Sequence, residues 1–354
     1  MSENLPELTG AHFVGSVNAA GTESVFRLAA DSCAGVLHAL PDGETGERWH
    51  WMLFQGSAFE NTPGLRRESD EPIDLNGFNV RPFVVEEGFD PSGLRLPELG
   101  YARAALESYA LFSKLKEEGK LPGDLRFQVS LPSPVACVNA FIHHDHRTAL
   151  EGPYEEALLR ELAAIQEAIP HGELCIQWDL ATEFALIEAP QIRGFGEQQA
   201  WFSDVLDGAV ERAARLGSQV AEGVTLGYHL CYGDLDEKHF VEPEDTGTLV
   251  QVANGLLEKT GRHVDFIHLP VPIERDDPAY FAPLKDLRLP EGTRVYLGLL
   301  HREDGVEGAL KRIRAAGTAL PRFGVATECG MGRSPRAEME QLFRQHQEVF
   351  DRLA

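Results

Sequence analysis

The chain is poor in the features that would direct it to a membrane or a nucleic acid. It has 32 Lys and Arg against 56 Asp and Glu in 354 residues, a formal charge of −24, so it lacks the positive field that nucleic acids and anionic lipid surfaces require. Its first residues are polar and acidic, without the apolar core of a signal peptide. No apolar run approaches the length of a membrane helix. We therefore expect no nucleic-acid partner and no membrane partner.

Cysteine is also scarce. The five cysteines are odd in number and far apart, which is unlike a disulfide framework and typical of a protein kept in a reducing cytoplasm. They are Cys33, Cys137, Cys175, Cys231 and Cys329. A hydrophobic content of 43%, with 8% aromatic residues, is enough to build a sizeable core. The composition therefore predicts a globular cytoplasmic protein.

Short β-branched or apolar runs alternate with longer amphipathic segments, which is the pattern of a parallel α/β fold. Eight segments are predicted as strands: 12–17, 35–40, 125–131, 174–180, 224–230, 264–269, 294–300 and 323–327. The clearest helices are predicted over 106–116, 154–168, 202–216, 249–259, 306–316 and 336–353, the last with Ser334 as N-cap and Pro335 at its first position. This alternation predicts one domain over residues 1–354, a single (β/α)8 TIM barrel. The Pro- and Gly-rich stretch 45–99 is predicted as a long excursion between strands two and three that covers the mouth.

Polar side chains follow nearly every predicted strand. In a barrel of this kind the site lies at the carboxyl ends of the strands, so these residues are expected to converge. They are Ser16, Asp42, Glu44, Asp179, Glu183, His229, Cys231, His268, His301 and Cys329. Their recurrence at strand ends is a stronger signal than any one motif.

His229 and Cys231 are the most informative pair in this set. They are two residues apart, so on a strand both side chains project from one face. Imidazole and thiolate are zinc ligands, and Cys329 can supply a third, which leaves an exchangeable position as in catalytic zinc sites. The plainer interpretation is a core strand with a buried cysteine and a hydrogen-bonded histidine.

Six segments in order resemble the catalytic barrel of cobalamin-independent methionine synthase, within the superfamily that includes uroporphyrinogen decarboxylase. They are Phe13-Val-Gly15-Ser16, Pro41-Asp42-Gly43-Glu44, Ile176-Gln177-Trp178-Asp179, His229-Leu-Cys231-Tyr232, the strand ending at His301, and Glu328-Cys329-Gly330-Met-Gly-Arg333. Their order and spacing make the resemblance specific. It implies the barrel fold and a zinc cofactor held by His229, Cys231 and Cys329. It further implies that Ser16, Glu44 and Asp179 bind substrate, the carboxylates at its amino group, and that His301 donates a proton.

The departures from the family pattern mark a divergent member. The family's zinc-binding Glu on strand six is replaced here by His268, in Phe266-Ile267-His268. His268 or Glu274 is a candidate fourth ligand, or three protein ligands and water complete the site. The second, N-terminal barrel of full-length synthases is missing, and the loop from Asp42 to Trp51 is not the synthase's own. The thiol, the alkyl donor and any use of folate or a corrinoid therefore stay open.

The predicted activity is methyl or alkyl transfer to a thiol. Zinc deprotonates a coordinated thiol, whereas a free thiol with a pKa of about 8.5 is only a few per cent thiolate at pH 7. The partners are then a small-molecule thiol and an alkyl or methyl donor, and the residues leave open whether copies of the chain form a homo-oligomer. The plainer interpretations are that Glu44 and Asp179 cap a helix or turn and that His301 is a hydrogen-bonded strand-end histidine.

Three other functions fit parts of the pattern. A thiol–epoxide alkyltransferase could use the same zinc site. A metal-independent decarboxylase or lyase of the superfamily would require an Arg-lined mouth, for which strand-end arginines are few. A barrel that binds zinc or a thiol without turnover is consistent with the missing strand-six Glu. Outside these motifs, His143-His144-Asp145-His146 is predicted as a loop on the rim of the site.

Overall fold

The computed structural model describes residues 5–188, 191–192, 196–233 and 239–353. Its centre is a curled sheet of eight parallel strands in the order β1-β14-β13-β12-β11-β8-β7-β2. The strands are β1 (Glu7–His12), β2 (Ala39–Pro41), β7 (Arg126–Pro132), β8 (Leu174–Leu180), β11 (Thr225–Leu230), β12 (Phe266–Pro270), β13 (Arg294–Leu300) and β14 (Arg322–Thr327). The two ends of this order, β1 and β2, approach each other at a parallel bridge between Ala11 and Leu37. The predicted α/β alternation is confirmed as a curled parallel sheet.

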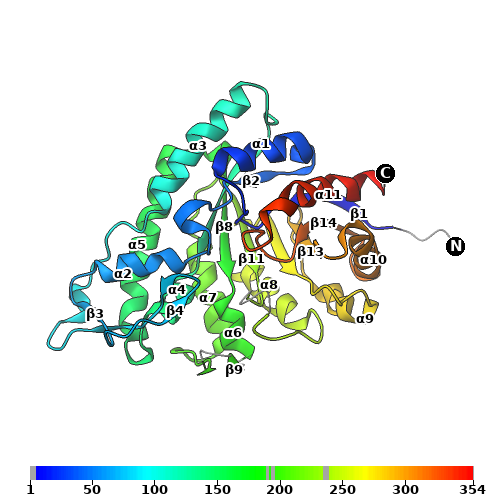
Figure 1. The fold of residues 1–354 in the computed structure, drawn as a ribbon. Helices are drawn as coiled ribbons and strands as arrows, with labels where there is room; N and C mark the ends of the chain where they lie inside the picture. The colour runs from blue at the N-terminus through cyan, green and yellow to red at the C-terminus, as the bar shows by residue number, and fades with distance from the viewer. Residues whose placement is uncertain (1–4, 189–190, 193–195, 234–238, 354) are drawn as a thin grey trace.

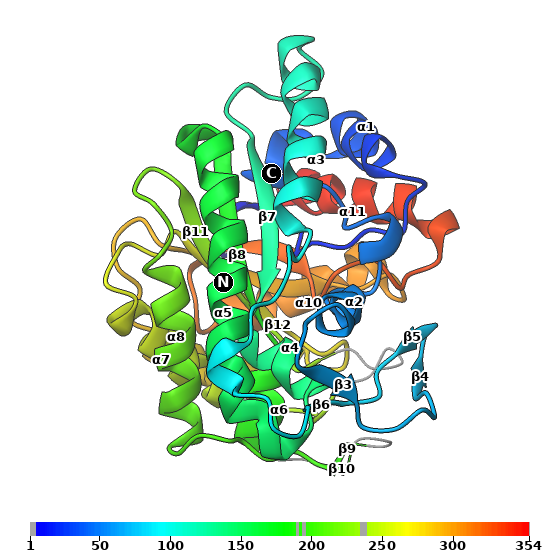
Figure 2. The ribbon, with the colours of Figure 1, turned by 90° about the vertical axis from the view of Figure 1, so that its left-hand side faces the viewer.

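Long helices surround the strands, as Figures 1 and 2 show. They are α1 (Thr22–Ser32), α3 (Tyr101–Glu117), α5 (Arg147–Ala168), α7 (Val205–Gly217), α8 (Gly247–Lys259), α10 (Gly305–Gly317) and α11 (Met339–Asp351). Each turns an apolar stripe inward; in α10 the stripe includes Val306, Ala309, Leu310 and Ile313. Because helices cover one face and side chains fill the other, every residue of β8 is buried.

The concave side of the sheet has a small core of its own. Side chains from five strands meet there and form a cluster separate from the main core: Ala39, Cys175, Phe266, Tyr296 and Ala326. Residues of strands this far apart in the sheet can meet only on its concave side. Two glycines make room for the rings. A Cβ at Gly227 would lie 2.1 Å from the Phe266 ring, and one at Gly324 would lie 2.3 Å from the Tyr296 ring.

The first two strands differ from the prediction. The first was expected over 12–17, but β1 ends at His12 and residues 13–17 form the loop that follows. The pairing of β1 with β14 shifts register between Leu8 and Ala11, at Gly10 with φ 132°, so the alternation that marks a strand is broken there. The second was expected over 35–40, but Ala34–Val36 is a 3-10 turn and only Ala39–Pro41 is strand.

Helix boundaries also differ from the prediction. Pro335 has ψ 130°, an extended conformation, so the last helix does not start there; a 3-10 turn over Arg336–Glu338 precedes α11. Two short helices after strands were not predicted, α4 (Pro134–Phe141) and α6 (Thr182–Glu188). The first had a readable signal, because Ser133 caps it by accepting a hydrogen bond from the Ala136 N–H, with Pro134 next.

The stretch between β2 and α3 is the predicted excursion. It holds helix α2 (Gly56–Glu60), the antiparallel pair β3 (Leu65–Arg67) and β6 (Phe83–Val85), and the hairpin β4 (Asp74–Leu75) and β5 (Phe78–Asn79). Figure 2 shows these elements projecting to one side of the sheet. A parallel bridge from Phe83 to Ile142 ties the excursion to the segment after α4. It thereby adds walls near the carboxyl ends of the strands.

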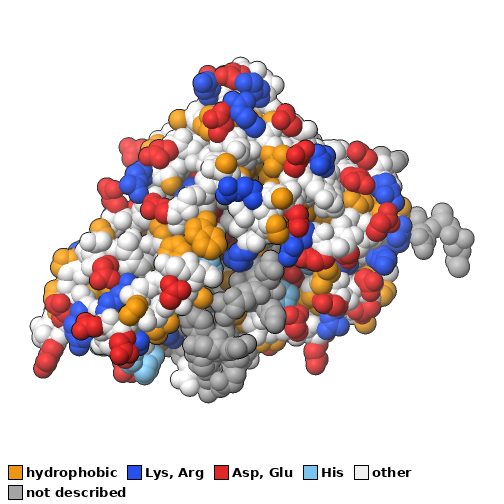
Figure 3. Space-filling view, viewed as in Figure 1, with side chains coloured by type: hydrophobic (Ala, Val, Ile, Leu, Met, Phe, Trp, Pro, Cys, Tyr) orange, Lys and Arg blue, Asp and Glu red, His pale blue; other side chains and the backbone are white. Residues whose placement is uncertain are grey.

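The surface agrees with the composition. On the face shown in Figure 3, acidic side chains are scattered widely with Lys and Arg between them, rather than gathered in one field. None of the helices in the described ranges is both long and apolar enough to cross a membrane.

Candidate metal and substrate site

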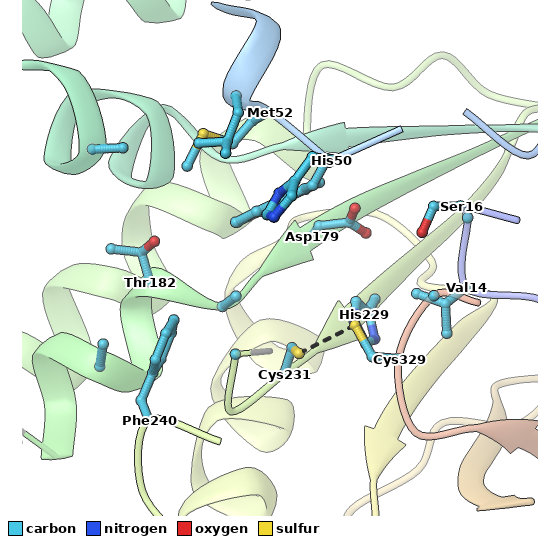
Figure 4. Close-up of a pocket in the computed structure, with 18 of the residues that line it drawn as sticks. Val14, Ser16, His50, Met52, Asp179, Thr182, His229, Cys231, Phe240 and Cys329 are labelled. Carbon is cyan, nitrogen blue, oxygen red and sulfur yellow. Dashed lines mark hydrogen bonds between the residues drawn. The ribbon is translucent and has the colours of Figure 1, made fainter. Parts of the chain in front are cut away.

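Three predicted metal ligands, His229, Cys231 and Cys329, lie together where β11 and β14 end. His229 is the penultimate residue of β11, and Cys231 extends that strand's pairing by donating its N–H to Leu180 O at 2.9 Å. Cys329 follows β14 in a turn held by the Thr327 hydroxyl, which donates to Cys329 O at 2.8 Å. Figure 4 shows the three side chains pointing toward one another. Because the parallel strands β11 and β14 end at the same edge of the sheet, Cys231 and Cys329 come into contact although they are 98 residues apart in the chain.

The spacing of the three ligand atoms matches a tetrahedral zinc site. Zn–S bonds of about 2.3 Å at a tetrahedral angle place two sulfurs about 3.8 Å apart, and a nitrogen at about 2.0 Å lies about 3.5 Å from a sulfur. The Cys231 and Cys329 Sγ atoms are 3.7 Å apart, and Cys329 Sγ is 3.9 Å from His229 Nε2. The hydrogen bond from Cys231 and the nearby His229 and Arg333 lower the pKa of Cys329 well below its usual value, against the effect of burial. The residues present therefore fit a zinc ion.

His268 holds His229 in position for this role. Thr327 O can only accept, so His268 Nε2, 3.0 Å away, carries the proton. Burial, together with the neighbouring His229 and His12, lowers the pKa of His268 well below its usual value, so the ring is neutral and its Nδ1 is an acceptor. His229 Nδ1, at 2.7 Å, must then donate to it. This leaves the lone pair of His229 on Nε2, the atom that faces Cys329.

The two candidates for a fourth ligand, His268 and Glu274, are not part of the group formed by His229, Cys231 and Cys329. Both ring nitrogens of His268 are engaged behind His229, so it serves as an orienting partner of the kind that metal-bound histidines have. Glu274 is exposed, and the metal-binding group found among the described residues does not include it. The structure thus brings three predicted ligands together and neither proposed fourth.

Replacing His268 by Ala should weaken zinc binding without removing a ligand. Outer-shell partners of this kind contribute about 10–100-fold in metal affinity, and the loss leaves His229 Nδ1 without its acceptor. Competition against a chelator of known affinity measures the change. Glu274→Gln is the matched control and should bind zinc as the wild type does. Equal affinity in His268→Ala, or weakened binding in Glu274→Gln, would contradict this assignment.

Glu44 and Asp179 are two carboxylates that line the cavity beside the cysteines, Asp179 buried and Glu44 half-buried. Burial, partly offset by Arg48, raises the pKa of Glu44 to about 8. Burial and then the charge of Glu44 raise the pKa of Asp179 well above its usual value, although Gln177 donates to it at 2.8 Å. Two carboxylates in one cavity, with the charge of Glu44 raising the pKa of Asp179, call for a cation between them. A substrate ammonium group is such a cation.

The backbone conformation at Glu44 directs its side chain into the cavity. Glu44 adopts φ 48°, in the left-handed region, between Gly43 and Gly46. Asp42, also noted in the sequence, is already engaged: it accepts from the Glu44 N–H, Arg48 and Ser108. It therefore shapes the loop, while Glu44 faces the cavity.

Ser16 also lies where the sequence placed it. It lines the same cavity as Glu44 and Asp179, and its backbone O accepts from the Met331 N–H at 2.7 Å. A Cβ at Gly330 would lie 2.3 Å from Ser16 Oγ, so glycine is needed at that position for the turn carrying Cys329 to approach.

His301 does not line this cavity. Its Nε2 donates to Val271 O at 2.8 Å, and its Nδ1 lies 3.9 Å from Glu328 Oε2. Burial, followed by the charge of Arg312, lowers the pKa of His301 to about 4, so the ring is neutral at pH 7. Its position is therefore behind the wall of the site.

Two residues near His301 were not singled out as site residues from the sequence. Burial raises the pKa of Glu328 to about 7, while its partner His239 lies 2.9 Å away and opposes that rise. Burial works against a charged His239, yet hydrogen bonds to Glu328 and Glu242 raise its pKa to about 9. Glu328 could have been noticed as the neighbour of Cys329. His239 follows no pattern, because its contact with Glu328 joins residues far apart in the chain.

The site opens into a cavity of about 170 Å³ with two unlike sides. One side carries the metal-binding group, the carboxylate pair, Ser16 and Arg333. The other is apolar and is built largely by the excursion and by α4 and α6; its members include Met52, Leu53, Leu75, Val80, Ala140 and Ala185. The excursion thus covers the site with mainly apolar side chains.

Comparisons with known proteins agree with the fold. No family model and no curated protein matches the chain. Among solved structures, it is similar to a B12-independent methionine synthase from Shewanella sp. W3-18-1 in complex with selenomethionine, at 16% identity and TM-score 0.60, over 98% of this chain and 99% of that one. It is also similar to a structure described as a vitamin-B12-independent methionine synthase from Listeria monocytogenes, at 14% identity and TM-score 0.57, over 99% of each chain. A methyltransferase from Methanosarcina mazei is similar at 12% identity and TM-score 0.53, over 98% of this chain and 94% of that one. The resemblance read from the sequence is confirmed for the fold, and these identities mark a divergent chain.

Proposed function

We propose that this protein is a zinc-dependent transferase that moves a methyl or small alkyl group onto the sulfur of an aminothiol. The observation that carries the proposal is one cavity in which a His229–Cys231–Cys329 group at near-tetrahedral spacing adjoins the carboxylates Glu44 and Asp179. The similar solved structures, two methionine synthases and a methyltransferase, support methyl transfer. We also propose that the sheet closes as a (β/α)8 barrel at the Ala11–Leu37 bridge, over one domain spanning residues 1–354.

A zinc ion held by these three ligands would bind a substrate thiol in its exchangeable position and deprotonate it. The chain's own residues prepare for this. His268 keeps the proton on His229 Nδ1, so Nε2 presents its lone pair. The carboxylate pair holds the ammonium group and so fixes where the sulfur lies, while the apolar side excludes water from the alkyl carbon.

The carboxylates also define the acceptor. An ammonium group stabilises the ionised forms of Glu44 and Asp179, whereas a carboxylate or sulfonate placed there would raise their pKa values further and gain no ion pair with them. Arg333, on the same wall, is suited to a carboxylate elsewhere on the substrate. We therefore propose a thiol amino acid or simple aminothiol as acceptor rather than an anionic thiol.

Of the other functions, thiol–epoxide alkylation gains one supporting observation. The apolar side of the cavity suits a small uncharged electrophile. A decarboxylase or lyase would need several arginines at the mouth, and Arg333 is the one arginine among the described residues that line the cavity. A barrel that binds zinc and a thiol without turnover would retain the acceptor site but give no product.

The proposal is tested with untagged, zinc-loaded protein and two thiols of similar size. Homocysteine and its desamino analogue, 4-mercaptobutyrate, are each supplied with methyl iodide or propylene oxide, and the thioethers are measured by mass spectrometry. Zinc-dependent alkylation of homocysteine well above that of the analogue supports the proposal, and the better donor separates methyl transfer from epoxide opening. Zinc-bound thiol without product would instead favour the non-catalytic alternative.

The proton-donor role of His301 stays a prediction, and its position provides a test. Removing a group that transfers a proton directly costs about 10²–10⁴-fold in rate. Because the His301 N–H is engaged with Val271 O behind the wall, we propose that it acts through Glu328, and His301→Asn should lower kcat less than about 10-fold. The measurement is kcat with homocysteine at pH 7. A loss beyond about 100-fold at unchanged zinc content would show direct proton donation.

A further inference from the structure

A second group of metal-ligating side chains lies outside the site described above. It consists of His143, His144 and Asp145, which follow α4. In the sequence three adjacent residues cannot be expected to face one ion. In the structure His144–His146 forms a 3-10 turn, and this turn folds the chain back so that one ligand atom from each residue lies within 4.8 Å of the others.

The distances in this group suit a transition metal. Metal–ligand bonds of about 2.0–2.2 Å at a tetrahedral angle place an imidazole nitrogen about 3.4 Å from a carboxylate oxygen. His144 Nε2 is 3.0 Å from Asp145 Oδ1, and His143 Nδ1 is 3.6 Å from Asp145 Oδ2. The two imidazole rings lie 4.1 Å apart between centroids. The two imidazole–carboxylate distances lie within a few tenths of an ångström of this value, and all three ligand atoms lie within 4.8 Å of one another.

The tautomer of His143 leaves its lone pair on Nδ1. This atom accepts a long hydrogen bond from the Asp145 backbone N–H at 3.4 Å, which a metal bound at Nδ1 would displace, and Nε2 carries the proton of the neutral ring. Nε2 faces Glu68 Oε1 at 3.8 Å. A metal-bound imidazole whose other nitrogen faces a carboxylate is the usual arrangement around protein-bound zinc.

Glu68 belongs to the excursion, which gives this group a place in the architecture. It follows β3 directly, and β3 pairs with β6. His143 in turn donates its backbone N–H to Phe83 O at the start of β6. Figure 3 shows His side chains at the surface beside this part of the molecule, next to acidic ones.

We propose that His143 Nδ1, His144 Nε2 and the Asp145 carboxylate form a second site for a divalent transition metal, with Glu68 as the carboxylate that orients His143. The side chains of His144 and Asp145 are 70% and 69% exposed, so an ion can enter and water can complete its coordination. The bound ion links the base of the excursion to the segment after α4, beside the apolar side of the cavity. This inference does not depend on the proposed activity.

The experiment uses full-length, untagged protein carrying Cys231→Ser and Cys329→Ser, which removes two ligands of the first site. Equilibrium dialysis against zinc, followed by elemental analysis, should find about one ion per chain in this background. Adding His144→Ala should remove it. Adding Glu68→Gln should weaken binding about 10-fold. Adding His263→Ala, another exposed histidine, is the matched control and should change nothing.

Limited proteolysis gives a second readout that requires no substrate. Zinc should slow cleavage within residues 66–82 of the parent background and leave cleavage of the His144→Ala protein unchanged. Zinc binding that survives His144→Ala, or that is lost equally in His263→Ala, would overturn the proposal. So would zinc binding that is indifferent to Glu68→Gln and gives no protection of the excursion, since it would show a surface ion without the proposed link.

Discussion

Protein carrying Cys231→Ser or Cys329→Ser is expected to be purified without zinc in the first site and to show no thiol alkylation above background. Each change replaces a thiolate with a hydroxyl, which is a poor zinc ligand at neutral pH, and leaves two protein ligands where three are needed. Elemental analysis of untagged protein and the homocysteine assay measure the two effects. Wild-type protein should retain about one tightly bound zinc at this site.

The matched control is Cys33→Ala. Cys33 is buried at the end of α1, outside the cavity, and burial raises the pKa of its thiol to about 12. This change should alter neither zinc content nor activity. Full activity in Cys231→Ser or Cys329→Ser would eliminate thiolate ligation as the basis of the mechanism. Loss of activity with zinc retained would instead assign the cysteines a role in the substrate pocket.

Asp179→Asn should abolish the preference for an aminothiol over its desamino analogue. Hydrogen bonds to charged groups contribute about 1.5–3 kcal/mol, which corresponds to about 10–100-fold in kcat/KM for homocysteine. The analogue, which lacks the ammonium group, should lose little. The comparison of kcat/KM for the two thiols is the measurement. Glu183→Gln is the control, because Glu183 is a buried carboxyl near the site that does not line the cavity.

The carboxylate pair also predicts a pH dependence of binding. Burial raises the pKa of Glu44 to about 8, so at pH 7 the empty cavity holds it mainly protonated. An ammonium ligand favours the carboxylate, so binding releases a proton and affinity should rise between pH 6 and pH 8. Calorimetry with methionine isolates this effect, because a thioether has no thiol proton to lose. Glu44→Gln should flatten the profile; a wild-type affinity that falls with pH would contradict the assignment.

Most strands and long helices could be predicted from the sequence because they depend on local patterns of apolar and polar residues. Strands such as Leu174–Leu180 and Arg294–Leu300 were predicted to the residue, since each is a short, mainly apolar run between longer helical segments. The first strand was misplaced where Gly10 interrupts the pairing. The small helix α6 carried too few turns to show a period.

The candidate site was also predictable in part from the sequence and in part only from the tertiary structure. By itself the sequence determined the ligand types, their position at strand ends and the resemblance to methionine synthase, because these depend on residue identity and order. Only the tertiary structure decided which atoms meet: that His268 hydrogen-bonds to His229, that His301 bonds to Val271 O, and that His239 reaches Glu328. The physical reason is that hydrogen-bond partners and burial, which set tautomers and pKa values, come from residues 30 to 98 apart in the chain. No local pattern encodes that proximity.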